Sequence, residues 1–290
     1  MNLKIMPKAD DHISRASRAI RQAGRVLAGK QPAGRNLTVF PDDVFLVSYP
    51  RSGNTWTRFL IGNMLDPSDP VTFATLEARI PEIYFTPDHT LREQTRPRIL
   101  KSHECFQPHY PRVIYLVRDP RDVAVSFYHH NIKAGNITDG YPMDEFVPRF
   151  IRGEFDPKWG SWSDHVKSWV MLRGYSPDFL AMRFETMKQE PLEQLARIAD
   201  FLRPRGFSVP STRDRLERAI KLSSPERMRK LEKEQAAEWE LTRNTRPDKA
   251  TVRTAKVGGW RDELSATAVG AIESAWGLLM QELGYELSGV

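Results

Sequence analysis

One stretch near the start of the chain constrains its fold most strongly: residues 44–65, VFLVSYPRSGNTWTRFLIGNML. The apolar run at residues 44–47 predicts a buried strand, and apolar side chains from Trp56 onward recur at helical spacing. In the polar loop between them, Gly53 lets the backbone come close to a ligand. A strand, a tight loop and a helix together direct backbone N–H groups and a helix N-terminus at one anion. The stretch therefore predicts an anion site, although an ordinary strand-to-helix connection would show similar polar residues.

The side chains of this loop favour anion binding. Arg51 adds a permanent charge on a planar guanidinium group, and Ser52, Asn54 and Thr55 add hydrogen-bonding groups. The loop differs from the usual nucleotide-triphosphate loop, whose signature is G-x-x-x-x-G-K-S/T. No lysine precedes the serine here, and only one glycine is present. The loop is therefore expected to hold a different kind of anion.

Strand and helix patterns alternate along the rest of the chain. Short apolar runs predict strands at residues 98–101, 112–117 and 179–184. Apolar periodicity predicts helices after Asp119-Pro120 and at residues 162–170, 192–202, 216–220 and 266–283. Residues 71–97 are expected to form loops and short helices, residues 135–157 to be irregular, and residues 226–248 to form a helix and then a loop. This order predicts an α/β fold, a three-layer sandwich in which helices cover both faces of a mostly parallel sheet.

Polar side chains follow several of the predicted strands. Residues 51–55, Ser102-His103, Arg118 and Glu185 all come where a strand ends. In parallel sheets, ligands bind outside the carboxyl ends of the strands. We therefore expect these groups to share one site.

The net charge of +6 is concentrated at one end of the chain. The first 36 residues contain eight basic and two acidic side chains, so the remainder is neutral overall. The basic character is therefore no evidence for a nucleic-acid partner. We expect residues 1–36 to form a basic amphipathic arm and residues 37–290 to form a single domain. The arm could dock on that domain, contact a membrane surface peripherally, or be a cleaved transit segment.

Other features narrow the expected setting and chemistry. No run of 18 apolar residues exists, and Cys105 is the only cysteine, so an intramolecular disulfide is impossible. These features suit a cytoplasmic location. We expect no metal site, because the nearest candidate pair, His129-His130, occupies adjacent helix positions that point apart.

Residues 50–56, Pro-Arg-Ser-Gly-Asn-Thr-Trp, resemble the 5′-phosphosulfate loop of the sulfotransferases, commonly Pro-Lys-Ser-Gly-Thr-Thr-Trp. Four later segments resemble sulfotransferase segments in the same order: Lys101-Ser102-His103, residues 113–129, residues 183–188 and residues 253–260. The resemblance covers most of residues 44–264. It implies the donor 3′-phosphoadenosine 5′-phosphosulfate (PAPS), the product 3′-phosphoadenosine 5′-phosphate (PAP), and transfer to a hydroxyl or amine without a metal.

The resemblance also implies roles for individual residues. His103 would be the general base, and Arg51 and Lys101 would meet the charge that grows on the leaving phosphate oxygen. The residues expected to bind the donor are Arg51, Ser52, Gly53, Asn54, Thr55, Trp56, Arg118, Ser126, Phe184, Ser223, Arg253, Thr254 and Ala255.

Several positions depart from the family pattern. Phe184 replaces a tyrosine, Thr254 a basic residue and Ala255 a glycine. The short dimer motif of the animal cytosolic members is not found near the C-terminus, so dimerisation by that route is not expected.

Two other classes of function compete with this interpretation. A P-loop kinase or ATPase could use Asp119 as a magnesium-binding acid, but the missing Gly-Lys-Ser/Thr argues against it. A non-catalytic module could bind a nucleotide or a membrane surface, but the presence of both Lys101 and His103 argues against a degenerate site. The sequence does not identify the acceptor, and its aromatic segments permit a phenol, a steroid or a lipid-linked sugar. It does not predict an oligomeric state either.

Overall fold

A computed structural model describes residues 31–209, 212–235, 237–239, 241–253 and 256–289. The expected helix of the basic arm lies outside the described residues, as do Thr254 and Ala255.

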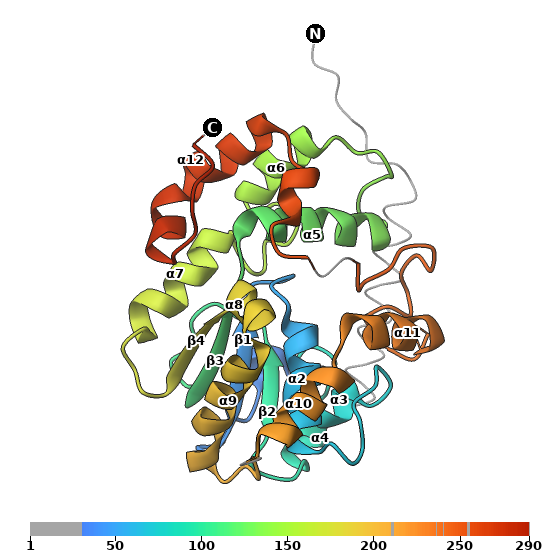
Figure 1. Ribbon diagram of the computed structural model, residues 1–290, viewed down its shortest axis with the longest axis vertical. Helices are drawn as coiled ribbons and strands as arrows, with labels where there is room; N and C mark the ends of the chain where they lie inside the picture. The colour runs from blue at the N-terminus through green and yellow to red at the C-terminus, as the bar shows by residue number, and fades with distance from the viewer. Residues whose placement is uncertain (1–30, 210–211, 236, 240, 254–255, 290) are drawn as a thin grey trace.

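A parallel sheet forms the centre of the molecule (Figure 1). Its four strands are β1 (Val44–Ser48), β2 (Ile99–Ser102), β3 (Arg112–Val117) and β4 (Phe179–Arg183), in the order β2-β1-β3-β4. Val44 of β1 pairs with Ile99 of β2 and with Arg112 of β3. All three pairings in the sheet are parallel, so the carboxyl ends of the strands meet at one edge.

The sequence also forms helices of very different lengths. They are α2 (Asn54–Leu65), α3 (Leu76–Arg79), α4 (Asp88–Arg92), α5 (Pro120–Lys133), α6 (Met143–Ile151), α7 (Trp162–Arg173), α8 (Phe184–Gln189), α9 (Pro191–Leu202), α10 (Arg213–Leu222), α11 (Pro225–Gln235) and α12 (Ala266–Glu282), with the short 3-10 helices η1 (Gly34–Asn36), η2 (Arg203–Arg205) and η3 (Gly259–Asp262).

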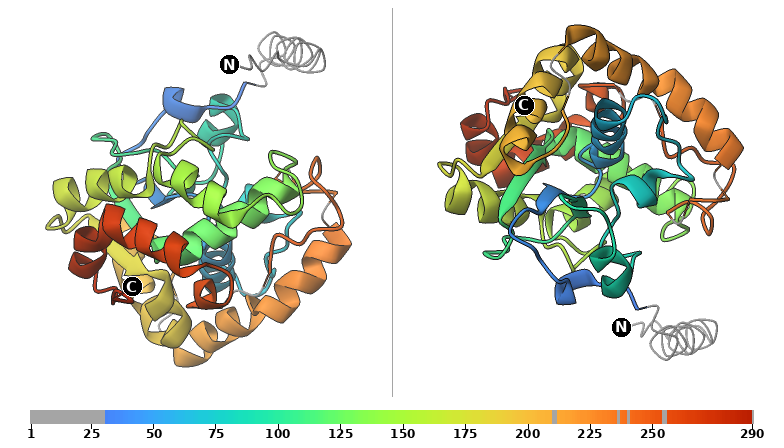
Figure 2. Two further views of the ribbon diagram at one scale, coloured as in Figure 1. Left: turned by 90° about the horizontal axis from the view of Figure 1, so that it is seen from above. Right: turned by 90° about the horizontal axis from the view of Figure 1, so that it is seen from below.

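The two faces of the sheet pack against different sets of helices. Successive side chains of a strand point to opposite faces. Phe45 and Val47 of β1 belong to a core with α5, α6, α7 and α12. Val44 and Leu46 belong to a second core with α2, α9 and α10. Figures 1 and 2 show helices of both sets packed around the sheet. The expected three-layer α/β fold is therefore confirmed.

Several of the expected elements differ from the structure, among them the strand expected at residues 98–101, which is Ile99–Ser102. Residues 135–157 contain α6, whose Phe146, Val147 and Phe150 are buried at helical spacing although Pro148 lies inside the helix. The proline and the short length hid this helix from a pattern search. The last strand ends at Arg183, because Phe184 already begins α8.

None of the helices in the described part of the chain is long and apolar enough to cross a membrane.

Candidate active site

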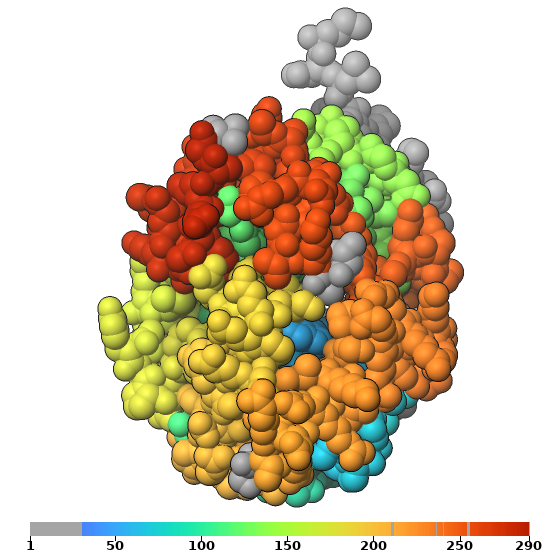
Figure 3. All heavy atoms as spheres, viewed as in Figure 1, coloured from blue at the N-terminus to red at the C-terminus, as the bar shows by residue number. Residues whose placement is uncertain are grey.

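A cavity of about 400 Å³ lies at the carboxyl ends of the strands. Many of the side chains singled out from the sequence line it: Arg51, Gly53, Asn54, Thr55, Trp56, Lys101, His103, Arg118, Ser126, Phe184 and Arg253. Figure 3 shows blue atoms from the α2 region at the bottom of a hollow between the yellow and orange segments. The alternation of strands and helices thus brings residues from distant parts of the chain into one site.

The loop between β1 and α2 has an unusual backbone. Gly53 has a φ of 98°, and a Cβ at this position would overlap the ring of Phe184. Arg51 also has a positive φ, 69°, which is uncommon for a residue with a side chain. Gly53 gives α2 no side-chain N-cap. The helix therefore presents its N-terminal N–H groups, with the positive end of its dipole, at the loop.

Three buried polar atoms near this loop have no hydrogen-bond partner among the described residues: Ser52 Oγ, Asn54 Oδ1 and Arg118 Nε. A buried polar atom without a partner is costly unless a ligand or water supplies one. Two of these atoms, the serine hydroxyl and the guanidinium N–H, can donate to an anion. The residues present therefore fit a negatively charged ligand.

Two arginines set the charge at this end of the cavity. Arg51 donates through Nε to Ser126 Oγ at 3.2 Å, and Arg118 donates to the main-chain oxygen of Arg51 at 3.3 Å. Asp122 lies 3.7 Å from Arg118, which makes a weak ion pair. Burial, and then the positive charge of Arg118, lower the pKa of Arg51 to about 10. Arg51 therefore remains charged at neutral pH.

Two aromatic rings lie beside the loop. Trp56 and Phe184 meet edge to face, with centroids 5.7 Å apart and ring planes at 75°. The Trp56 indole donates to the main-chain oxygen of Ser223 at 3.0 Å. Lys188 lies 4.8 Å from the centre of the Trp56 ring, and Arg118 lies 4.5 Å from that of Phe184. The two rings can therefore make apolar contact with a planar nucleobase, and positive charge lies close to that contact.

The hydroxyl of Ser223 is not brought into the cavity. It is buried, donates to the main-chain oxygen of Ala219 at 2.8 Å and accepts from Asn63 Nδ2 at 3.0 Å. Ser223 contacts the site through its main-chain oxygen, which accepts a hydrogen bond from the Trp56 indole.

His103 is held by three hydrogen bonds. Its Nδ1 atom lies 2.6 Å from the main-chain oxygen of Ser48. A carbonyl oxygen only accepts, so Nδ1 carries the proton, and Nε2 is the ring nitrogen with a free lone pair. The main chain of His103 donates to the Tyr84 hydroxyl and accepts from His165 Nε2, both at 3.0 Å. Burial, and then the charge of Lys101, hold the pKa of His103 well below its ordinary value. The imidazole is therefore neutral at pH 7.

Lys101 has a partner that the sequence did not reveal. Its ammonium group lies 2.6 Å from the carboxylate of Glu82, and both side chains are almost fully buried. Burial lowers the pKa of Lys101, and Glu82 opposes that shift. Glu82 comes from residues 71–97, which were expected to form loops and short helices, and an isolated parallel bridge aligns it with Lys101.

The segment before α12 closes the far side of the cavity. Arg253 pairs with Glu263 at 2.9 Å, and His129 Nε2 lies 2.5 Å from the same carboxylate. The Asp122 carboxylate accepts the main-chain N–H groups of Gly258 at 2.9 Å and Trp260 at 3.0 Å. Sequence reasoning missed these anchoring carboxylates. The contacts of Glu263 with His129 and of Asp122 with Gly258 and Trp260 join positions more than 130 residues apart, which no local pattern indicates.

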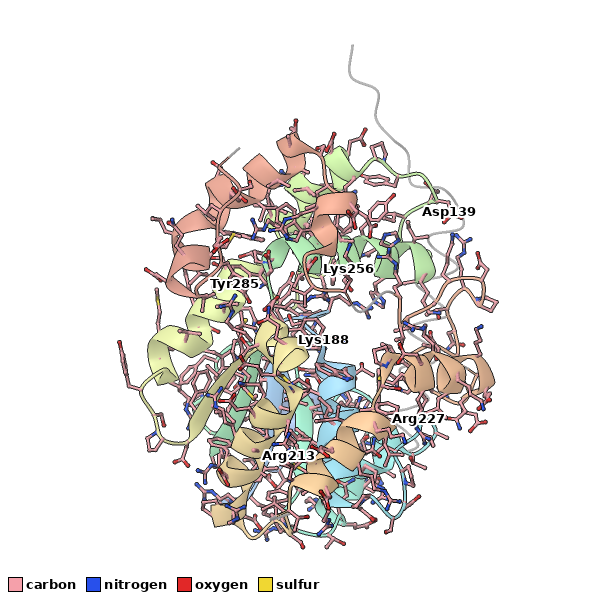
Figure 4. All side chains as sticks on the ribbon, in the orientation of Figure 1. Asp139, Lys188, Arg213, Arg227, Lys256 and Tyr285 are labelled. Atoms are coloured by element: carbon pink, nitrogen blue, oxygen red, sulfur yellow. The ribbon has the colours of Figure 1, made fainter. Side chains whose placement is uncertain are left out.

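Figure 4 shows Lys188 of α8 and Lys256 of the segment before α12 on facing sides of the cavity, whose lining includes both. Within the part of the chain that the structure describes, no group of three or more His, Cys, Asp or Glu side chains could hold a metal ion.

Comparison with known proteins shows which family this chain belongs to. The family model of the sulfotransferase domain matches residues 41–284. Sulfotransferase 2B1 of Homo sapiens is 35% identical over 176 residues, which are 57% of this chain and 47% of that protein. Sulfotransferase 1B1 of Canis lupus familiaris is 31% identical over 178 residues, or 56% of this chain and 59% of that protein. The chain thus spans about half the length of the curated relatives it matches.

Solved structures show the same fold. A retinol dehydratase in complex with androsterone and PAP superposes with a TM-score of 0.69 at 21% identity, over 89% of this chain and 86% of that one. Mouse sulfotransferase SULT7A1 complexed with PAP gives a TM-score of 0.66 at 24% identity, over 86% and 87% of the two chains. Because the family model matches most of its length, the chain belongs to the sulfotransferase domain family.

Proposed function

We propose that this member of the sulfotransferase family transfers a sulfuryl group from PAPS to a hydroxyl or amine of a small acceptor. The observation that carries the proposal is the single cavity that unites the loop after β1, His103, and the pair Arg118 and Ser126. An anion site, a neutral base and a second positive centre are the three parts that this chemistry requires. Two solved relatives contain PAP, which supports the choice of donor.

The donor would lie across the cavity. Its 5′-phosphosulfate would meet the N–H groups of the loop and Arg51, because a helix N-terminus and a permanent positive charge lie together there. Its 3′-phosphate would lie at Arg118 and Ser126, with Arg253 approaching from the segment before α12. Its adenine would contact Trp56 and Phe184, which lie beside Arg118. Thr254 and Ala255 remain further candidates for the 3′-phosphate.

The reaction would exchange one bond to sulfur for another. The acceptor oxygen or nitrogen forms a bond to sulfur while the bond between sulfur and the leaving phosphate oxygen breaks. The acceptor proton passes to Nε2 of His103, whose other nitrogen is engaged by Ser48. Arg51 and the loop N–H groups stabilise the negative charge left on the phosphate. Lys101, paired with Glu82, would assist from the β2 side once the acceptor is bound.

The kinase interpretation is not supported by the contacts of Asp119. Its carboxylate caps α5 by accepting from the main chain of Arg121 at 2.9 Å and is bound by the guanidinium of the same residue at 2.7 Å. A carboxylate with these partners is not free to hold magnesium beside a nucleotide.

A transfer assay tests the proposal. The full chain is incubated with ³⁵S-labelled PAPS and a panel of phenols, steroid alcohols, lipid-linked sugars and amines, with and without a chelator. We expect labelled acceptor and PAP in equal amounts, with no effect of the chelator. Label that stays on the donor with every acceptor, or phosphate transfer from ATP instead, would overturn the proposed function.

A further inference from the structure

A buried carboxylate lies next to His103 and has no part in the proposed chemistry. Glu104 is fully buried, although ionised groups are costly to remove from water unless they are paired. Its two oxygens have different partners. Oε2 accepts from Arg35 Nε at 2.7 Å, and Oε1 accepts from the Tyr84 hydroxyl at 3.2 Å. A buried charge kept at this position calls for an explanation.

Tyr84 connects this carboxylate to the base. Because its hydroxyl donates to Glu104, the oxygen lone pairs are free to accept the main-chain N–H of His103 at 3.0 Å. The Tyr84 ring is nearly parallel to the imidazole, at 7° and a centroid distance of 6.5 Å. Trp159 packs against both rings, with its ring centroid 4.8 Å from that of Tyr84 and 5.8 Å from that of His103, and all three side chains line the cavity. Tyr84 therefore fixes the peptide of His103 and borders its ring.

Arg35 is itself held in place, although 65% of its side chain is exposed. The main chain around it pairs with the segment that carries Tyr84. Ala33 donates to the oxygen of Thr86 at 2.9 Å, and Gly34 donates to that of Ile83 at 2.8 Å. In both views of Figure 2, the blue η1 lies beside the teal α4 region. Residues 31–37 straddle the expected boundary at residue 36. They contact the segment that carries Tyr84 and, through Arg35, the carboxylate of Glu104.

We propose that Arg35, Glu104 and Tyr84 form a positioning relay that holds His103 in line for proton transfer. The proposal rests on the proposed function of His103 as the base. Arg35 holds the Glu104 carboxylate in place, Glu104 orients the Tyr84 hydroxyl, and the hydroxyl holds the main chain of His103. A small displacement of a reacting group lowers the rate strongly while leaving remote binding intact. The relay therefore acts on turnover, and the donor end of the cavity does not depend on it.

Kinetics of the full chain test the relay with Arg35→Ala, Arg35→Lys and Glu104→Gln. We expect Arg35→Ala and Glu104→Gln each to lower kcat about tenfold while the Kd for PAP, measured by calorimetry, changes less than about twofold. Arg35→Lys should recover part of the loss, because the ammonium group can still pair with Glu104. The double variant Arg35→Ala/Glu104→Gln should be no slower than Glu104→Gln, because the two residues act in one chain.

A matched control is Arg213→Ala. Arg213 is also exposed and also lies 2.7 Å from a carboxylate, that of Glu217, but on α10 and remote from His103. It should keep wild-type kcat. Wild-type kcat in both Arg35→Ala and Glu104→Gln would overturn the relay, as would a parallel loss of PAP binding, which would indicate general damage. If Glu104→Gln fails to fold, the kcat and the Kd for PAP of Arg35→Ala alone test the relay, because the Arg35 side chain is exposed.

Amide hydrogen exchange separates failure of the relay from failure of the proposed function. Arg35→Ala should increase deuterium uptake in the peptide that contains the His103 N–H and not in peptides from α9. Unchanged uptake overturns the relay whether or not the enzyme is active. If the wild type transfers no sulfuryl group to any acceptor while uptake responds as expected, the proposed function fails and the contact chain stands.

Discussion

The Nδ1 atom of His103 lies 2.6 Å from the main-chain oxygen of Ser48, the last residue of β1. Ser48 immediately precedes the loop between β1 and α2, so one hydrogen bond connects the proposed base to the proposed phosphosulfate site. The bond also determines which ring nitrogen carries the proton and leaves Nε2 as the acceptor. The tautomer and the position of the base thus follow from the same contact.

Replacing His103 tests its role as the base. His103→Ala should lower sulfuryl transfer at least a hundredfold, because a positioned base typically contributes about 10²–10⁴-fold. The Kd for PAP should stay within a few-fold, because the imidazole is expected to face the acceptor. Rates and calorimetry on the same preparation provide both values. Residual turnover above about a tenth of wild type would exclude His103 from this role.

The pH dependence of the rate should reflect the lowered pKa of His103. Burial and the charge of Lys101 disfavour the protonated ring, so the neutral base persists below the ordinary histidine value of about 6.5. The profile of kcat/KM should therefore stay flat from about pH 8 down past pH 6.5 and fall only at lower pH.

Lys101→Met should shift the pKa of His103 and, with it, the acid limb of the pH profile. It removes a positive charge near His103 and leaves the Glu82 carboxylate without its partner. Both changes raise the pKa of His103, so the acid limb of the profile should move to higher pH. An acid limb that stays in place or moves to lower pH would contradict this electrostatic assignment.

Arg51 should supply charge that the reaction needs. Arg51→Ala should reduce the rate about a hundredfold, as expected for loss of one group that stabilises developing charge. Arg51→Lys should retain part of the rate, because it keeps the charge without the planar guanidinium. Both replacements carry a Cβ at the same positive φ, so backbone strain cancels in the comparison. Equal rates for the two variants would show that the charge of Arg51 is not used.

Gly53 should be needed for two separable reasons, its backbone conformation and its contact with Phe184. Gly206→Ala is the matched control, because Gly206 also has a positive φ, 82°, but a Cβ added there would meet no atom of the described residues within 4 Å beyond its chain neighbours. Both variants should lose roughly 1–2 kcal/mol of unfolding free energy through the left-handed backbone. Gly53→Ala should lose about 1–3 kcal/mol more through overlap with the buried ring. Equal losses in denaturant unfolding would refute the contact argument.

Those strands and helices that have a local sequence pattern could be predicted from the sequence. The apolar runs of β1 and β3 and the Asp119-Pro120 helix start are local signals, and the parallel sheet followed from their alternation with helices. The short α6 could not be found in this way, because Pro148 and the surrounding loops mask its spacing.

The candidate site was predicted only in part, for a related reason. Arg51, His103 and Arg118 follow strands, and parallel strands end together, so their convergence could be inferred. Glu82 and Glu263 are defined only by tertiary contacts with Lys101 and Arg253, and no spacing indicates them. Resemblance also suggested Ser223, whose hydroxyl is occupied by buried neighbours in this structure.

Binding of two nucleotides tests the central claim most directly, because PAP carries a 3′-phosphate and 5′-AMP does not. Arg118 lies beside Phe184 and lines the cavity together with Ser126, so it should hold that phosphate through a charge-assisted hydrogen bond. By calorimetry, wild type should bind PAP much more tightly than 5′-AMP. Arg118→Ala should weaken PAP by about 1.5–3 kcal/mol, or one to two decades in Kd, and leave 5′-AMP nearly unchanged. Equal affinity of wild type for the two nucleotides, or parallel loss of both in the variant, would contradict the account.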